Sequence, residues 1–500
     1  MFTASETSII GLIVLAGFGI LGWGFYQARP LGKLGILAWL QSVVLMTPWL
    51  LLFGLFVVGI YINIVGVLFL LVASVALYVT LGSQLRAAQD VSMRSKATER
   101  LNDSSIDVEQ IKLNQVNTTK PATAPPEVNI KSIPEAELGK IRGIFGIDTF
   151  FATETIPYQE GVIFKGNLRG EPEAVHKRLT ASLSEQVGDR YRLFLVENLD
   201  GKPVIIVLPS TSDPRTTTWQ QKILALALFL ATIATSLETG GLLLGFDFFN
   251  NLGRFREPLP VALGILTVLI AHEVGHWLLA RRHQVRLSLP FFLPTLQIGA
   301  FGAITKFESV VPNRKVLFDV AVAGPAFGGI VSLLMLIGGL LLSHPGSWFQ
   351  VPSEFFQGSI LVGTLARVVL GNAVHQPLVD VNPLVVVGWL GLVITALNLM
   401  PAGQLDGGRI VQAIYGRKMA GRTTVATLIV LAIACLANPI ALYWAIVILF
   451  LQRDLERPNL NELTEPDDAR AALGLLALFL MIVTLLPITP ALAGRLGIGN

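Results

Sequence analysis

His272, Glu273 and His276 lie within one apolar stretch of the chain, in the order His-Glu-Val-Gly-His. If the stretch is helical, the two histidines are four residues apart and share a face, so both imidazoles can bind one metal ion. Glu273 lies beside them and can take a proton from a metal-bound water. Ionisable residues inside an apolar span usually mark function. The pattern is typical of a zinc hydrolase that works within a membrane.

Asp406 is the best candidate for a further ligand, because a catalytic zinc site needs three protein ligands and an open position. It follows an apolar stretch, in a segment where Pro401 and several glycines oppose regular helix. Non-helical backbone at membrane depth must be buried in protein or line a wet cavity. The alternative is that Asp406 caps the helix that follows it. For Asp319, at the start of another span, we expect a structural role.

The composition predicts a membrane protein with several spans. Of 500 residues, 52% are hydrophobic and only 14% are charged, against about 25% charged in an average soluble domain. The net charge of +3 is too small to favour nucleic acid as a partner. Cys435 is the single cysteine, which excludes an internal disulfide and a cysteine-rich metal site.

We expect a polytopic α-helical protein of nine or ten spans, since a span needs about 20 apolar residues. A small α+β domain is inserted after the third span, with the element order α-β-β-α-β-β. Apolar stretches lie near 7–26, 36–57, 60–82, 223–245, 257–280, 316–342, 383–400 and 470–490, with one or two more helices in 424–452, where Asn438-Pro439 forms a break. The expected domains are 1–82 (N-terminal spans), 83–131 (flexible linker), 132–210 (the α+β domain) and 221–500 (the catalytic domain).

Basic residues near the ends of the apolar stretches predict the orientation. Arg281, Arg282, Arg314, Lys315 and Arg409 all fall on one side if the expected spans are correct. We expect this side to be cytoplasmic and to carry the α+β domain.

The His-Glu-Val-Gly-His motif, followed in a later span by Asn398, Pro401 and Leu405-Asp406-Gly407, resembles the site-2 protease family of intramembrane zinc metalloproteases. Segments 323–328 (Ala-Gly-Pro-Ala-Phe-Gly) and 297–303 (Gln-Ile-Gly-Ala-Phe-Gly-Ala) are similar to that family's glycine-proline motif and its membrane-associated β-loop. Segment 166–169 (Gly-Asn-Leu-Arg) resembles a motif of the plastid and cyanobacterial branch, the ethylene-dependent gravitropism-deficient and yellow-green proteases.

The resemblance implies a Zn²⁺ cofactor and a substrate that is itself a transmembrane protein in the lipid bilayer. It implies that His272, His276 and Asp406 bind zinc, that Glu273 is the catalytic base, and that Asn398 assists catalysis. The β-loop residues expected to bind substrate are Gly299, Ala300, Phe301 and Gly302. An extended edge there could pair with an unwound substrate strand.

The expected function is therefore hydrolysis of peptide bonds in membrane-spanning substrates, that is, regulated intramembrane proteolysis. Two alternatives stay open: a non-catalytic membrane scaffold that keeps the fold, and a membrane prenyl-protein endoprotease with a glutamate as third ligand. Plant members of the branch carry transit peptides, and this chain shows none, so a bacterial plasma or thylakoid membrane is expected rather than a plastid. The sequence leaves the oligomeric state open.

Overall fold

The computed structural model describes residues 18–57 except 20, the single positions 74, 77, 81 and 84, and residues 133–488 except 159, 199, 436–438 and 453. The chain divides into two compact units, residues 1–128 with 429–446, and residues 129–428 with 447–500. The first unit contains the short helix η1 (Arg29–Leu31) and the helix α2 (Gly32–Val57). The expected spans 7–26 and 60–82 and the expected linker 83–131 lie mostly outside the described residues.

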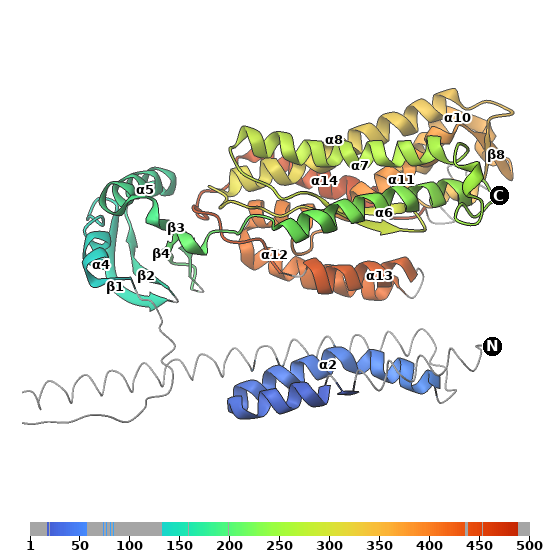
Figure 1. Ribbon diagram of the computed structural model, residues 1–500. Coiled ribbons are helices and arrows are strands. Elements are labelled where there is room, and N and C mark those ends of the chain that lie inside the picture. The colour runs from blue at the N-terminus through green and yellow to red at the C-terminus, as the bar shows by residue number, and fades with distance from the viewer. Residues whose placement is uncertain are drawn as a thin grey trace, which may run out of the picture. The chain divides into compact units, whose positions relative to one another are not determined.

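The second unit begins with a small two-layer domain, which confirms the α+β prediction. Its elements are α4 (Glu135–Arg142), β1 (Phe150–Tyr158), β2 (Gly161–Leu168), α5 (Pro172–Val187), η2 (Gly188–Arg190), β3 (Tyr191–Glu197), β4 (Pro203–Pro209) and η3 (Ser210–Ser212). The strands form an antiparallel sheet in the order β1-β2-β4-β3. Helix α5 buries Val175, Leu179, Leu183 and Val187 against this sheet. Figure 1 shows both helices on one face of the sheet.

Four helices in the described part of the chain are long and apolar enough to cross a membrane: α6 (Trp219–Leu243), α7 (Leu259–Arg282), α8 (Arg314–Leu342) and α14 (Asp468–Leu485). The other described helices after residue 250 are η4 (Leu252–Arg254), α9 (Glu354–Gln357), α10 (Ile360–Leu370), η5 (Gly371–His375), α11 (Pro383–Asn398), α12 (Asp406–Ala434), α13 (Pro439–Val447) and η6 (Ile448–Gln452). The end of α12 and nearly all of α13 belong to the first unit. The expected total of nine or ten spans is therefore not confirmed.

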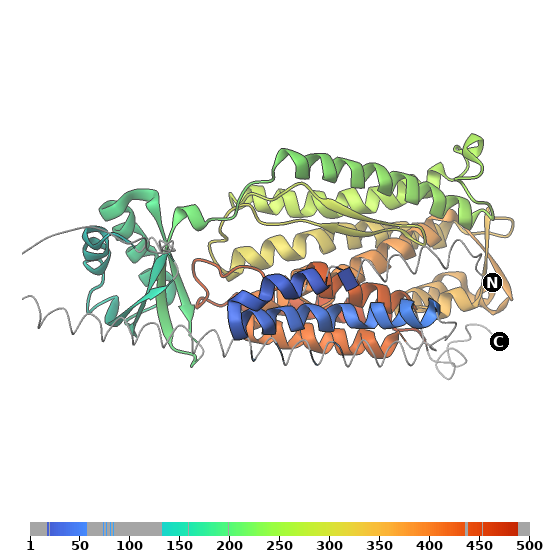
Figure 2. The same cartoon turned by 60° about the horizontal axis from the view of Figure 1, so that its bottom comes forward.

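Helix α11 covers the expected span 383–400 but is not among these four helices. It has 16 residues, so it is about 24 Å long and shorter than the roughly 30 Å hydrocarbon core. Nearly all of its residues are buried, and it packs on α8 through close approaches at Gly388 and Gly391. Figures 1 and 2 show α11 running alongside α7 and α8. Its apolar character therefore reflects burial within the protein.

Two small antiparallel sheets complete the helical block. Strands β5 (Phe291–Thr295) and β6 (Gly299–Ile304) form a hairpin that packs against α6, and β7 (Phe349–Pro352) pairs with β8 (Leu378–Val381). The hairpin occupies the region expected to form the β-loop. It places β6 between α6 and α11.

The segment 459–462 connects the small domain to the helical block. The Leu195 N–H of β3 donates to the Leu460 carbonyl (2.8 Å), and the Glu462 N–H donates to the Leu195 carbonyl (2.9 Å). On its other side, the Leu460 N–H donates to the Val311 carbonyl (3.0 Å). One edge of the domain's sheet is thus paired with a segment from the far end of the chain.

Candidate metal centre

Helix α7 places His272 and His276 on one face, as their spacing predicts. The two Nε2 atoms are 3.1 Å apart, and both side chains are buried. The Nδ1–H of His276 donates to the Val320 carbonyl at 2.8 Å. That bond fixes the ring orientation and leaves the Nε2 lone pair free to bind a metal.

Asp406 comes from a distant part of the chain and meets the two imidazoles. Its Oδ2 lies 3.1 Å from the His272 Nε2 and 3.3 Å from the His276 Nε2. Helix α12 begins at Asp406, after the non-helical segment 399–405. The expected unwound segment is therefore present. The side chain lies beside the histidines, although Asp406 also stands in the first turn of a helix.

The three side chains fit a zinc ion. At zinc–ligand distances of about 2.0–2.1 Å, ligand atoms at tetrahedral corners lie about 3.3 Å apart. The three observed separations of 3.1, 3.1 and 3.3 Å match this value. With neutral imidazoles, the Nε2 lone pairs and the carboxylate would converge on one point, an arrangement that suits a bound cation.

Two glycines of α8 make room for the imidazoles. A Cβ atom at Gly324 would lie 2.2 Å from the His276 Nε2, and one at Gly328 would lie 3.1 Å from the His272 Cβ. On α7, a Cβ at Gly275 would lie 2.4 Å from the Ala323 carbonyl oxygen. The absence of side chains at these positions lets the two helices approach closely around the histidines.

Glu273 lies beside the imidazoles: one ligand atom each from His272, Glu273 and His276 lies within 4.8 Å of the other two. Its Oε2 accepts a hydrogen bond from the Thr305 hydroxyl at 2.7 Å. Asp406 is the nearer carboxylate, at 3.1–3.3 Å from both Nε2 atoms. The Thr305 hydroxyl, directly after β6, therefore positions Glu273.

Arg409, one turn after Asp406, is a site residue that the sequence analysis treated only as an orientation marker. It is buried, and its guanidinium binds Glu456 (3.0 Å) and the Thr305 carbonyl (2.7 Å). The second Asp406 oxygen, Oδ1, lies 3.8 Å from Arg409. Arg314 is buried too, and it donates to the Ala413 carbonyl at 2.7 Å. Neither residue is a solvated loop charge, because internal carbonyl and carboxylate groups bind both.

The Asn398 side chain links α11 to the hairpin. Its Nδ2 donates to the Phe301 carbonyl (3.1 Å) and to the Ile394 carbonyl (2.9 Å). Both amide hydrogens are thus engaged. A Cβ at Gly302 would lie 2.4 Å from this Nδ2, so the glycine permits the contact.

The residues expected to bind substrate, Gly299, Ala300, Phe301 and Gly302, all lie in β6 and are buried. The Gly299 carbonyl accepts a hydrogen bond from the Thr235 hydroxyl at 2.6 Å. With the Phe301 carbonyl bound to Asn398, helices α6 and α11 contact the strand that was expected to pair with substrate.

The cavity at the site is small, with a volume of about 10 Å³. It is lined by residues of α7, of β6 and the position after it, of α11, of the non-helical segment, of α12 and of η6: His276, Ala303, Ile304, Thr305, Asn398, Gln404, Leu405, Asp406, Arg409 and Gln452. This volume is about that needed for one water molecule. The described arrangement therefore has no room for a peptide beside the histidines.

Comparisons with known proteins agree with this geometry. The sequence model of peptidase family M50 matches residues 260–437, and that of the EGY3 middle domain matches residues 139–214. The probable zinc metalloprotease EGY2, chloroplastic, of Arabidopsis thaliana is 39% identical over 371 residues, covering 73% of this chain and 67% of the relative. No solved structure matches the chain significantly.

Two further Arabidopsis thaliana relatives extend the comparison. The probable zinc metalloprotease EGY1, chloroplastic, is 38% identical over 71% of this chain and 72% of the relative. The probable zinc metallopeptidase EGY3, chloroplastic, is 32% identical over 70% of this chain and 65% of the relative. The chloroplast location of these relatives conflicts with the expected bacterial membrane. The chain belongs to peptidase family M50, the intramembrane metalloproteases, and it is a zinc metalloprotease whose cofactor is Zn²⁺.

Proposed function

We propose that this zinc metalloprotease is an endopeptidase that hydrolyses peptide bonds within membrane-spanning protein substrates in the lipid bilayer, as a step of regulated intramembrane proteolysis. The observation that carries the proposal is the convergence of His272, His276 and Asp406 at 3.1–3.3 Å, beside Glu273. The long apolar helices α7 and α8 that surround this point support a location within the membrane.

His272, His276 and Asp406 would hold the Zn²⁺. When bound there, the ion supplies Lewis acidity, which activates water and polarises a carbonyl. Glu273 would take a proton from the attacking water and return it to the leaving amine. The Thr305 hydroxyl orients the Glu273 carboxylate for this role through its 2.7 Å hydrogen bond.

Asn398 and the β6 residues would act on the substrate only after a rearrangement. Because both Asn398 amide hydrogens bind carbonyls, one of these bonds must break before Asn398 can donate to a developing oxyanion. An unwound substrate strand would likewise have to displace the helix contacts of Gly299 or Phe301. The small cavity volume agrees with the need for such an opening.

Glu273→Gln tests the proposal in the purified full-length protein. The amide cannot take a proton, so we expect cleavage of a single-span peptide to fall by about 10²–10⁴-fold, with the zinc content unchanged. Glu257→Gln, at an exposed pair with Arg254, is the matched control and should cleave normally. If Glu273→Gln cleaves as fast as the wild type, the proposed mechanism is wrong.

The same assay separates the two alternatives. A non-catalytic scaffold would show no zinc-dependent cleavage in the wild type. A prenyl-protein endoprotease would prefer prenylated peptides and would use a glutamate as third ligand. The contact of Asp406 with both imidazoles supports an aspartate in that place.

A further inference from the structure

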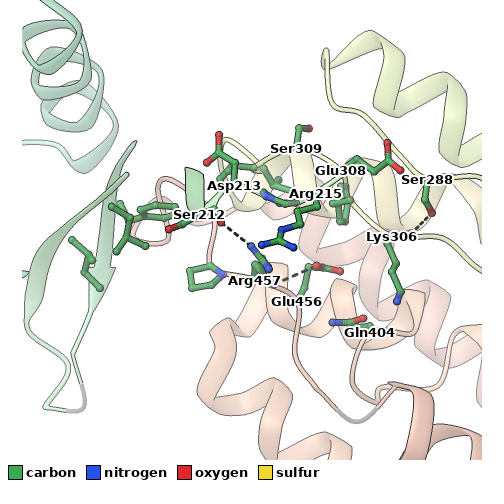
Figure 3. Close-up of a pocket in the computed structure, with 18 of the residues that line it drawn as sticks. Ser212, Asp213, Arg215, Ser288, Lys306, Glu308, Ser309, Gln404, Glu456 and Arg457 are labelled. Carbon is green, nitrogen blue, oxygen red and sulfur yellow. Dashed lines mark hydrogen bonds between the residues drawn. The ribbon is translucent and has the colours of Figure 1, made fainter. Parts of the chain in front are cut away.

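A second and much larger cavity lies between the small domain and the helical block. Its volume is about 730 Å³, which falls within the roughly 300–1,000 Å³ of ordinary ligand pockets. Its lining includes the sheet of the small domain, residues 212–217, residues 306–311 after the hairpin, and residues 456–458. In Figure 3, Arg215 and Arg457 lie between the sheet and the helices, and the Lys306 side chain extends toward Gln404.

One wall of this cavity is apolar. Phe194 and Val196 of β3 and Ile206 and Leu208 of β4 line it. They alternate with residues that are fully buried under α5, so they form the opposite face of the sheet. The uncovered face of a two-layer sheet is usually polar. An apolar face that borders a cavity is suited to contact side chains of a partner.

The charges of the lining are unevenly paired. The lining holds four acidic residues and four basic ones: Glu197, Asp213, Glu308 and Glu456, and Arg215, Lys306, Arg417 and Arg457. Glu308 accepts a hydrogen bond from the Thr217 N–H at 2.7 Å. Asp213 binds Arg192 at 3.1 Å, and Glu456 binds Arg409 at 3.0 Å. Both partners lie outside the lining. The Lys306 ammonium and the Arg215 guanidinium line the cavity, and the described residues provide no carboxylate partner for either. The cavity therefore carries cationic groups that are available to an anionic ligand.

The cavity adjoins the metal centre. Gln404 lines both this cavity and the small cavity that contains His276 and Asp406. Lys306 directly follows Thr305, whose hydroxyl binds Glu273. A substrate chain that leaves the centre on this side would enter the larger cavity.

We propose that the cavity binds the extended segment that flanks the substrate's transmembrane span. An acidic side chain of that segment would contact Lys306 and Arg215, and an apolar side chain of it would contact the sheet face of β3 and β4. This proposal rests on the proposed function and names a substrate class for it. Because a helix must unwind before its carbonyls can be attacked, the flanking segment is drawn into extended form. The small domain would thus select substrates by the charge of their flank.

The test measures binding rather than cleavage, in the full chain carrying Glu273→Gln, reconstituted with zinc in phosphatidylcholine nanodiscs. The probes are fluorescent single-span peptides that differ only in an aspartate-rich or a lysine-rich flank. We expect the acidic peptide to bind about tenfold more tightly, since two charge contacts of modest strength together approach that factor. The double variant Lys306→Glu with Arg215→Glu should reverse the preference.

Lys140→Glu, on the exposed side of α4, is the matched control and should leave the preference unchanged. The proposal is overturned if both peptides bind equally, or if the double variant and Lys140→Glu behave alike. A third outcome also overturns the proposal: in nanodiscs that contain phosphatidylglycerol, the wild type still binds the peptides but no longer prefers the acidic one. Lys306 and Arg215 would then bind lipid headgroups. Binding does not require turnover, so failure of the catalytic proposal would be seen separately in the cleavage assay.

Discussion

Two aspartates, the buried Asp406 and the partly buried Asp319, each meet a histidine of the α7 region, yet their surroundings differ. Asp319 accepts two hydrogen bonds from Arg470, at 2.7 and 2.9 Å, and lies 3.1 Å from the His283 Nε2. Asp406 lies 3.1 and 3.3 Å from two imidazoles, while its nearest guanidinium, that of Arg409, is 3.8 Å away and binds Glu456.

The difference shows what separates a structural carboxylate from a metal ligand. At Asp319 the Arg470 guanidinium donates to both carboxylate oxygens and links α14 to α8. At Asp406 the Oδ2 atom faces two imidazoles, and Arg409 approaches the other oxygen, Oδ1, only to 3.8 Å. We therefore propose different roles for the two aspartates, with Asp406 as a zinc ligand and Asp319 as a structural carboxylate bound by Arg470.

The largest expected effect separates the two aspartates directly. Asp406→Asn removes the charge of a proposed zinc ligand, so zinc affinity should fall by more than the roughly 10–100-fold that loss of an outer-shell partner costs. Cleavage should fall below detection. Asp319→Asn should keep zinc and cleavage but lower the thermal unfolding midpoint, because it weakens charged hydrogen bonds worth about 1.5–3 kcal/mol each. Metal content and thermal unfolding of both purified variants provide the measurements.

The comparison fails if the two variants behave alike. Full zinc retention in Asp406→Asn would remove this residue from the ligand set. Zinc loss in Asp319→Asn would mean that the α8–α14 contact is needed to hold the metal centre together.

Much of this contrast could be predicted from the sequence, for local reasons. The spacing of His272 and His276 places them on one face of any helix. The proline and glycines around Asp406 oppose regular helix in their own segment. Both are short-range features. The elements of the small domain follow from strand alternation and turn residues in the same way. The total of nine or ten spans is not confirmed, since a helix such as α11 is equally apolar whether protein or lipid covers it.

The positioning residues could not be predicted because their partners are distant in the chain. Thr305 and Glu273 are 32 residues apart, and Arg409 and Glu456 are 47 residues apart. Nothing in the local pattern distinguishes Arg409 from a solvated basic residue near a span end. The one available signal is that Arg409 follows Asp406 by three residues in a helix, which places both on one face.

A smaller effect is expected at Gly324, where α8 makes room for the metal centre but contributes no ligand. In Gly324→Ala the new methyl group would lie 2.2 Å from the His276 Nε2, so the imidazole must move. We expect zinc affinity to fall by about 10–100-fold. Gly338→Ala is the control on the same helix, because nothing lies within 4 Å of its Cβ position. Equal zinc affinity in both variants would show that the imidazole contact is not required.

The smallest effect is expected at Thr305, which contacts the base and not the ligands. Thr305→Val keeps the side-chain shape and removes the hydroxyl that donates to Glu273 at 2.7 Å. A hydrogen bond to a charged group is worth about 1.5–3 kcal/mol, so kcat should fall by about tenfold or more while KM and zinc content stay unchanged. Thr305→Ser should restore kcat, because a serine hydroxyl can donate to the same oxygen. If Thr305→Val and Thr305→Ser reduce kcat equally, the hydroxyl does not position Glu273. The surroundings of Asp406 would then differ from those of Asp319 only through the proposed metal ligands.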